Sequence, residues 1–291
     1  MTDQIVPIVV PIFLCAGLGM AWVKLKQPFD TKSLTALVSD VGFPCLLLSS
    51  LDRPGLTLDL VARTFVAGSL AVLCFAAIGT LVLRAFGLEV RRYLPALMLP
   101  NTGNLGVPIA YFVFGEDGLI FAVAFSTLIQ VGHLTIGVWL ASGQMSPGSL
   151  LKSPMIHAFC LALILIGTGI ELPAGILATT KLLGGIAVPL MLLMLGASLA
   201  ELSITSFLRP FALSLVRVFG GFTVGFGLAS VLRLTPIAAG TFAIQCAMPV
   251  AVLTHLFAQK YGGPSKEIAG MILISTGLAL ASLPVVLLFV R

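Results

Sequence analysis

The residues best suited to bind a small charged molecule lie in a short run from Leu99 to Pro108, with the sequence LPNTGNLGVP. Asn101 and Asn104 carry side-chain amides, which can hold a carboxylate without a charged partner. The prolines and glycines interrupt a regular helix. Gly103 lets the backbone approach a ligand closely, or it only allows a tight helix crossing. Where a helix restarts after such a break, its first N–H groups favour an anion. The alternative for Asn101 is that its side chain only caps the following half-helix.

The sequence on both sides of this run is strongly apolar, at residues 94–98 and 109–114. Lipid cannot satisfy the backbone polar groups that a break exposes, so such a break is tolerated only inside protein or beside a water-filled cavity. Broken helices of this kind hold the substrate in many secondary transporters. The run therefore predicts a carrier.

Uncharged polar residues in two other apolar stretches are further candidates for substrate contact. Gln130 and His133 are one helical turn apart, and His133 could also exchange a proton near neutral pH, although a lone histidine in a packed helix is more often a core residue. Gln245 lies four residues before Pro249 and could line the site from the second half. Ser126, like other hydroxyl residues within the spans, is expected to bond a carbonyl of its own helix.

Four charged residues are candidates for ion coupling or for anion contact. Asp40 lies inside an apolar stretch, where a carboxylate is costly, unless it faces an aqueous vestibule. Asp59 and Arg63 are spaced i, i+4, so they can form an ion pair. During transport one of them could exchange the other for substrate or a proton, or the pair is merely interfacial. Arg217 lies well inside another stretch and is expected to contact carbonyls, Asp40 or the substrate, or else to snorkel to the surface.

These residues are embedded in an integral membrane protein. Of the 291 residues, 58% are hydrophobic and only 9% are charged, against about 25% charged in soluble domains. Apolar stretches of membrane-spanning length recur. The sequence predicts an all-α fold with ten spans, at residues 5–23, 33–51, 60–86, 94–114, 118–141, 155–170, 174–199, 207–232, 236–259 and 268–290.

Short motifs recur in the same order in the two halves of the chain. VLR at 82–84 and VLR at 231–233, for example, end the third and eighth spans. Five spans per half require the second copy to insert upside down, as in inverted-repeat transporters. We therefore predict a first repeat at 1–142, a linker at 143–153 and a second repeat at 154–291. The fourth and ninth spans are expected to cross as broken helices, with Pro108 facing Pro249.

The basic residues predict the orientation of the chain in the membrane. One set of alternate loops carries about twice as many Lys and Arg residues as the other, and it is expected to face the cytoplasm. Both termini then lie on the non-cytoplasmic side of the inner (plasma) membrane. This bias explains the net charge of +5, and no nucleic-acid partner is expected. The cysteines and histidines lack metal-ligand spacing, so neither a metal nor another cofactor is expected.

Two segments resemble the auxin efflux (PIN-like) carrier family. LPNT at 99–102 followed by GVP at 106–108 is similar to the fourth-helix motif of this family. IQCAMP at 244–249 followed by FAQKY at 257–261 is similar to its ninth helix. The resemblance extends over essentially the whole chain.

This resemblance implies a fold shared with bile-acid sodium symporters and sodium–proton antiporters. Spans 1, 2, 6 and 7 would form a scaffold, often dimeric, and spans 3–5 and 8–10 a transport domain that moves as an elevator. The implied substrates are small organic anions such as carboxylates. The substrate asparagine of the family corresponds to Asn101, its crossover prolines to Pro108 and Pro249, and its second-repeat contact to Gln245. Auxin itself is less well matched, because Gly103 and Asn104 replace larger apolar residues of plant members.

Alternative functions remain open on the sequence alone. A sodium-coupled symporter of the bile-acid type would share the architecture, and coupling to protons or to sodium is undecided. A membrane sensor without transport activity is a further alternative, because a fold does not fix a function. An enzyme is not expected, since neither paired aspartates nor a serine–histidine pair converge in the spans.

Overall fold

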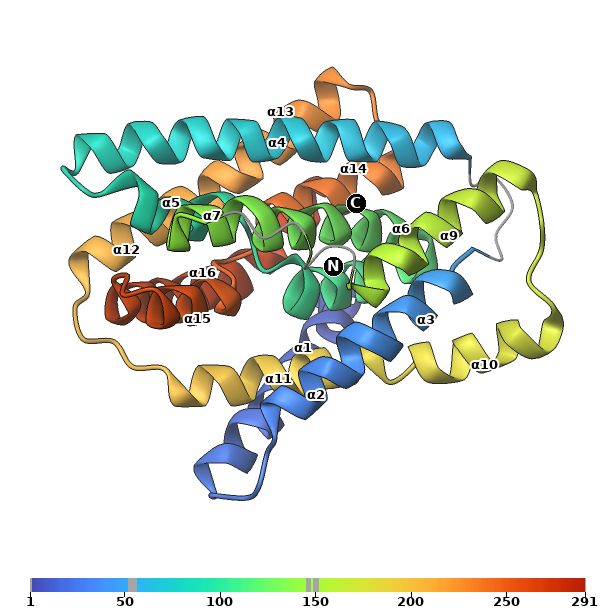
Figure 1. The fold of residues 1–291 in the computed structure, drawn as a ribbon, viewed down its shortest axis with the longest axis horizontal. Coiled ribbons are helices and arrows are strands. Elements are labelled where there is room, and N and C mark those ends of the chain that lie inside the picture. The colour runs from blue at the N-terminus through green and yellow to red at the C-terminus, as the bar shows by residue number, and fades with distance from the viewer. Residues whose placement is uncertain (1, 52–56, 145–147, 149–151, 291) are drawn as a thin grey trace.

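The computed structural model describes residues 2–51, 57–144, 148 and 152–290, and this part of the chain is helical without any strand (Figure 1). Most of the linker predicted at 143–153 lies outside the described residues. The helices of the first half are α1 (Thr2–Lys24), α2 (Thr31–Leu37), α3 (Phe43–Ser49), α4 (Leu58–Ala85), α5 (Val90–Met98), α6 (Val107–Gly132) and α7 (Val138–Ser142). Those of the second half are α9 (Pro154–Thr168), α10 (Ala174–Gly184), α11 (Ala187–Glu201), α12 (Leu208–Leu215), α13 (Gly221–Val231), α14 (Pro236–Cys246), α15 (Val252–Lys260) and α16 (Ser265–Val290).

Four single π-helical turns, which are wider than α-helical turns, lie between neighbouring α-helices in the described residues. These turns are η1 (Val38–Gly42), η2 (Thr102–Gly106), η3 (His133–Gly137) and η4 (Val216–Gly220). Each turn carries one of the polar residues that the sequence singles out, namely Asp40, Asn104, His133 and Arg217. Such turns are rare and occur frequently at functional sites.

Within the described residues, seven helical segments are long and apolar enough to cross a membrane, and the apolar helices α9 and α14 are shorter. The segment Thr102–Ser142 has 41 residues, about twice the length that one crossing requires. Gly115 interrupts it with non-helical dihedral angles (φ 62°, ψ −150°), so the chain bends there. The predicted spans at 94–114 and 236–259 are each divided into two pieces, because Pro and Gly residues break them. The described residues therefore show seven segments of spanning length, and the breaks in the fourth and ninth predicted spans are present.

The helices pack in two neighbouring groups (Figure 1). In one group, α1 packs on α11, and α3 packs on α9 and α10. In the other, α4 packs on α5 and α6, α14 packs on α6 and α13, and α12 packs on α16. The α1–α11 crossing is close, because a Cβ atom at Gly19 would overlap the carbonyl of Leu193 and one at Gly196 would overlap the carbonyl of Ala16.

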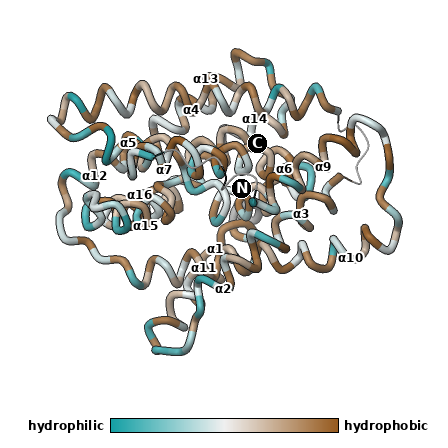
Figure 2. Tube along the Cα trace, in the orientation of Figure 1, coloured by the Kyte–Doolittle hydropathy of each residue, from teal (hydrophilic) through white to brown (hydrophobic). Residues whose placement is uncertain are grey.

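The outward-facing sides of several helices are apolar. Leu14 on α1, Leu73 on α4, Leu182 on α10 and Leu208 on α12 are all more than 60% exposed. Figure 2 shows hydrophobic residues along most of α4 and hydrophilic residues in the connection between α1 and α2. A surface of this composition is suited to contact with lipid.

Candidate functional site

The two helix breaks meet in the middle of the structure. The chain between α5 and η2 runs antiparallel to the chain between α14 and α15, with Pro100 paired to Val250. The backbone N–H of Asn101 donates a hydrogen bond of 2.8 Å to the carbonyl oxygen of Pro249. The N–H of Val250 donates one of 3.1 Å to the Oγ atom of Ser275, on α16. Backbone groups freed by the breaks are thus satisfied inside the protein, as a break at membrane depth requires.

This pairing corrects one prediction about the crossing. Pro249 lies opposite the residues Pro100 and Asn101 rather than opposite Pro108. Pro108 lies in the first turn of α6, where a helix tolerates a residue without an N–H group. The prediction was wrong because short apolar motifs in the two halves can be aligned in several ways, which differ by a few residues.

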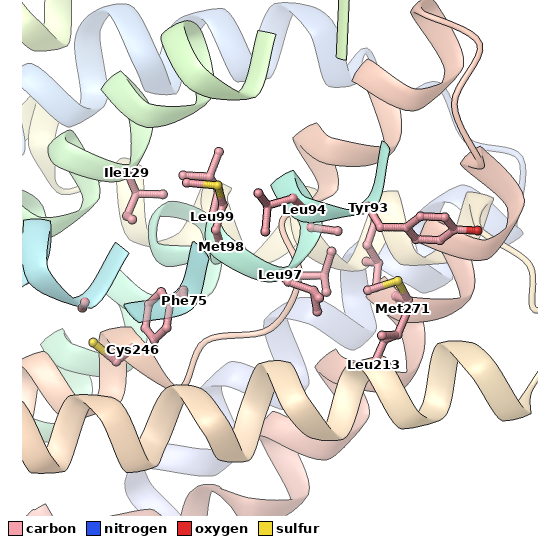
Figure 3. Packing of buried hydrophobic residues seen from close by; sticks show 14 of the residues in the cluster. Phe75, Tyr93, Leu94, Leu97, Met98, Leu99, Ile129, Leu213, Cys246 and Met271 are labelled. Carbon is pink, nitrogen blue, oxygen red and sulfur yellow. The ribbon is translucent and has the colours of Figure 1, made fainter. Parts of the chain in front are cut away.

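Arg217 connects the ends of the two helices that stop at the breaks. Its side chain is 2% exposed. Its Nη1 atom donates a 2.6 Å hydrogen bond to the carbonyl of Leu97, in the last turn of α5, and its Nη2 atom donates to the carbonyl of Cys246, the last residue of α14. The guanidinium carbon lies 4.2 Å from the ring centre of Phe75, which packs in one cluster with Leu97 and Cys246 (Figure 3). Arg217 therefore faces the interior and binds carbonyls, one of the outcomes expected from the sequence.

A cavity of about 730 Å³ lies beside the crossing, between the two groups of helices. One wall comes from α2, η1 and α11, and the other from η2, α6, η3 and α15. Its volume is in the range typical of small-molecule sites. Five of the predicted site residues line it, namely Asn101, Gly103, Asn104, Gln130 and His133.

The other predicted residues lie outside this lining. Gln245 is fully buried behind the crossing, where a Cβ atom at Gly106 would overlap its Oε1 atom. Asp59 and Arg63 form an exposed ion pair of 2.7 Å, in line with the interfacial alternative. Asp40 is exposed and is not among the cavity residues.

Three cavity residues carry a buried polar atom that has no hydrogen-bond partner. These atoms are Nδ2 of Asn101, Oγ of Ser126 and Nε2 of His133. Asn101 precedes the first turn of η2, but its side chain makes no capping hydrogen bond, so the capping alternative is wrong. Because an unpaired buried polar group is costly, these three atoms are candidates for a hydrogen bond with a ligand or a water molecule.

Ser126 is a cavity residue that the sequence did not single out as a candidate for substrate contact. Its neighbour Thr127 bonds the carbonyl of Val123 in its own helix at 2.9 Å, as expected, whereas Ser126 has no such bond. Ser126, Gln130 and His133 have the spacing i, i+4, i+7, which places them on one helix face, and that spacing was the available signal. His133 also contacts its own helix, since its Nδ1 atom lies 3.0 Å from the carbonyl oxygen of Ile129.

The cavity reaches the protein surface, and several polar residues lie in the exposed part of its lining, which we call the polar end. Lys32, Glu201 and Gln259 line the cavity and are exposed, and His255, which is half-buried, lines it too. The Nδ1 atom of His255 is 2.9 Å from the carbonyl oxygen of Ser265. Nothing in the sequence singles out these four residues, because each lies near a helix end, where polar residues are common.

Two helices begin at the cavity wall. Thr102 and Gly103 open η2, Ala251 and Val252 open α15, and all four residues line the cavity. The first N–H groups of a helix have no partner within that helix. Because both N-termini lie in the cavity wall, their partial positive charges favour an anionic ligand there.

Comparison with known proteins identifies the family of the chain. The model of one family, described as membrane transport protein, matches residues 2–146 and 137–287. The chain belongs to this membrane transport family. The resemblance to auxin efflux carriers had predicted this result. Membership, together with several spanning helices, makes the chain a multi-pass membrane protein of a transporter family rather than of an enzyme family.

Two archaeal proteins are similar to this chain. An uncharacterized transporter of Methanothermobacter thermautotrophicus is 28% identical over 279 residues, which cover 88% of this chain and 87% of the relative. An uncharacterized transporter of Methanocaldococcus jannaschii is 27% identical over 193 residues, 63% of each chain.

Ser126→Ala should weaken ligand binding to this family member about 5-fold, the effect of one hydrogen bond, without lowering its melting temperature. The Ser126 Oγ atom has no protein partner to lose. Isothermal titration with a bound anion, together with thermal unfolding, measures both effects. Thr127→Val is the matched control, because Thr127 bonds its own helix and does not line the cavity. Equal affinity for Ser126→Ala and wild type would exclude Ser126 from the site.

Ser275→Ala should destabilise the protein by about 1–3 kcal/mol, because the buried N–H of Val250 loses its acceptor. Thr276→Val, at the next residue, should be neutral or stabilising, because the Thr276 Oγ1 atom is buried without a partner. Thermal unfolding in detergent compares the two variants. The same melting temperature in both would contradict a role for Ser275 in supporting the crossing.

Proposed function

We propose that this protein is a secondary transporter of small organic anions, carboxylates in particular, which bind in the cavity beside the helix crossing. One observation carries the proposal: two helix N-termini and the unpartnered amide nitrogen of Asn101 meet in one cavity. An amide donor and helix N-termini together favour a carboxylate over a cation or an apolar ligand.

The charges around the cavity support a substrate with one negative charge. Each helix N-terminus contributes roughly half a positive charge, so η2 and α15 together offer about one. Lys32 and Glu201, at the polar end, have opposite formal charges. A monocarboxylate would therefore balance the site, whereas a second carboxylate would need Lys32 as its partner.

The helix packing supports an elevator mechanism within a ten-span, inverted-repeat topology. If Thr102–Ser142 crosses the membrane twice around Gly115, and α14 together with α15 forms one broken crossing, the described helices accommodate ten spans. The group with α1, α3, α9 and α11 would be the scaffold, and the group with α4 to α7 and α12 to α16 would move. The cavity lies between these groups, where relative sliding would open it to either side.

The distribution of basic residues supports an inward-open state. Lys32 and Lys260 lie on the side that the positive-inside rule places in the cytoplasm, and Lys32 lines the polar end of the cavity. The cavity would then open to the cytoplasm, with both termini on the opposite side of the inner membrane. A homodimer formed by the scaffold is part of the same proposal.

Electrophysiology on solid-supported membranes with purified proteoliposomes tests this function. The panel is malonate, malate, succinate, indole-3-acetate and taurocholate, each with and without sodium and a pH gradient. A saturable current with one carboxylate supports the proposal, and its ion dependence identifies the coupling. Saturable binding without any current, from folded protein, would favour the sensor alternative. A response that requires sodium and taurocholate would favour a bile-acid-type symporter.

A further inference from the structure

The negative ends of two helices meet at one buried positive charge. The carbonyls of Leu97 and Cys246 belong to the last turns of α5 and α14, and both accept hydrogen bonds from Arg217. A helix C-terminus carries roughly half a negative charge, so the two ends together amount to about one. A single guanidinium neutralises them both.

The hydrogen bonds that Arg217 makes go to main-chain oxygens rather than to a carboxylate. The charge of Arg217 is thus available to balance the helix ends. The ring of Phe75 covers the guanidinium at 4.2 Å, an arrangement that favours a cation.

The surrounding backbone is shaped to hold this contact. Gly221 follows η4 directly, and a Cβ atom there would overlap the carbonyl of Cys246. At Gly225, one turn later, a Cβ atom would lie 2.6 Å from the Cβ of Cys246. The close approach of α13 to α14 therefore depends on two glycines that face Cys246.

Carbonyl oxygens at the C-terminal ends of broken helices are the groups that coordinate Na⁺ in many secondary transporters. Two such ends converge here, and the guanidinium of Arg217 already lies between them. A metal cation at the same carbonyls would lie within a few ångströms of a permanent positive charge, which would repel it.

We propose that Arg217 is a built-in cation of the crossing, which takes the position between the two helix ends that a coupling Na⁺ would otherwise occupy. Substrate binding then requires no metal cation at the crossing. That substrate binds without a metal cation rests on the proposed function. That Arg217 balances the charge of the helix ends does not.

Thermal unfolding of the substrate-free protein tests this role without reference to transport. Wild type, Arg217→Ala and Arg217→Lys are compared in chloride salts of choline, Na⁺, K⁺ and guanidinium at equal low-millimolar concentrations. The wild-type melting temperature should be the same in all four salts. Arg217→Ala should melt lower in choline and should regain stability, saturably, with guanidinium and to a smaller extent with Na⁺. The melting temperature of Arg217→Lys in choline should lie between those of wild type and Arg217→Ala.

Arg63→Ala is the matched control, because the side chain of Arg63 is 60% exposed in a surface ion pair. The melting temperature of this variant should not depend on the cation. A selective effect of Na⁺ on the wild type would overturn the proposal. So would an Arg217→Ala protein that is as stable as wild type, or one that guanidinium does not rescue.

If Arg217→Ala does not fold, Arg217→Lys and the wild-type Na⁺ titration decide instead. A lysine variant that is destabilised in choline and insensitive to Na⁺ supports the proposal, and one that needs Na⁺ to fold overturns it. Because no substrate enters these measurements, they remain valid if the carboxylate panel gives no response.

Discussion

Asn101→Ala is expected to weaken anion binding by about 10- to 100-fold, which corresponds to the loss of one hydrogen bond to a charged group. The Nδ2 atom of Asn101 has no protein partner, so a carboxylate bound as proposed would be its acceptor. The fold should survive, because the crossing is held by the backbone N–H of Asn101 and the carbonyl of Pro249, which the substitution retains.

Isothermal titration measures this loss with the carboxylate that the proteoliposome panel identifies, and size-exclusion chromatography checks the fold. Gln144→Ala is a suitable control, because Gln144 is an exposed amide residue just after α7 and does not line the cavity. Wild-type affinity in Asn101→Ala would remove Asn101 from the site and would leave the helix N-termini as its main anion-binding element.

Gly221→Ala is expected to destabilise the protein by about 1–3 kcal/mol, the usual effect of overpacking a tight contact, and to lower its melting temperature by several degrees. The added methyl group would overlap the carbonyl of Cys246 and press on the guanidinium of Arg217. Since that carbonyl belongs to the backbone, α13 and α14 must move apart to accept the methyl group, and the bond between Arg217 and Cys246 weakens.

The neighbouring residue provides a matched control for this experiment. A Cβ atom at Gly220 would have no atom within 4 Å, so Gly220→Ala should be neutral or slightly stabilising, because alanine favours a helix. Thermal unfolding in one detergent compares both variants with wild type. If the two alanine variants melt at the same temperature, the tight contact between α13 and α14 does not contribute to stability.

The sequence predicted the features that depend on local composition. The helix break between α5 and η2 could be predicted because Pro and Gly interrupt a helix. The predicted substrate contacts Asn101, Asn104 and Gln130 line one cavity, and their contact with substrate stays a prediction. The family was also identified from the motifs around these residues.

The features that the sequence did not predict depend on contacts between distant segments. The pairing of Pro100 with Val250 requires the register of two chains, which short motifs do not determine. Ser126 was expected to bond a carbonyl of its own helix, yet its Oγ atom has no partner in the described structure. Whether such a bond forms depends on how α6 faces the cavity. The helix ends that Arg217 joins are 120 and 29 residues away, and no local pattern indicates them.

The contact between Arg217 and the helix ends also bears on how this protein can diverge in evolution. Both acceptors are main-chain carbonyls, at Leu97 and Cys246, so the contact makes no demand on the identity of either side chain. Mutations at positions 97 and 246 can accumulate without a compensating change at position 217. Covariation between aligned homologues would therefore fail to reveal this link, although a substitution at position 217 would affect both half-helices at once.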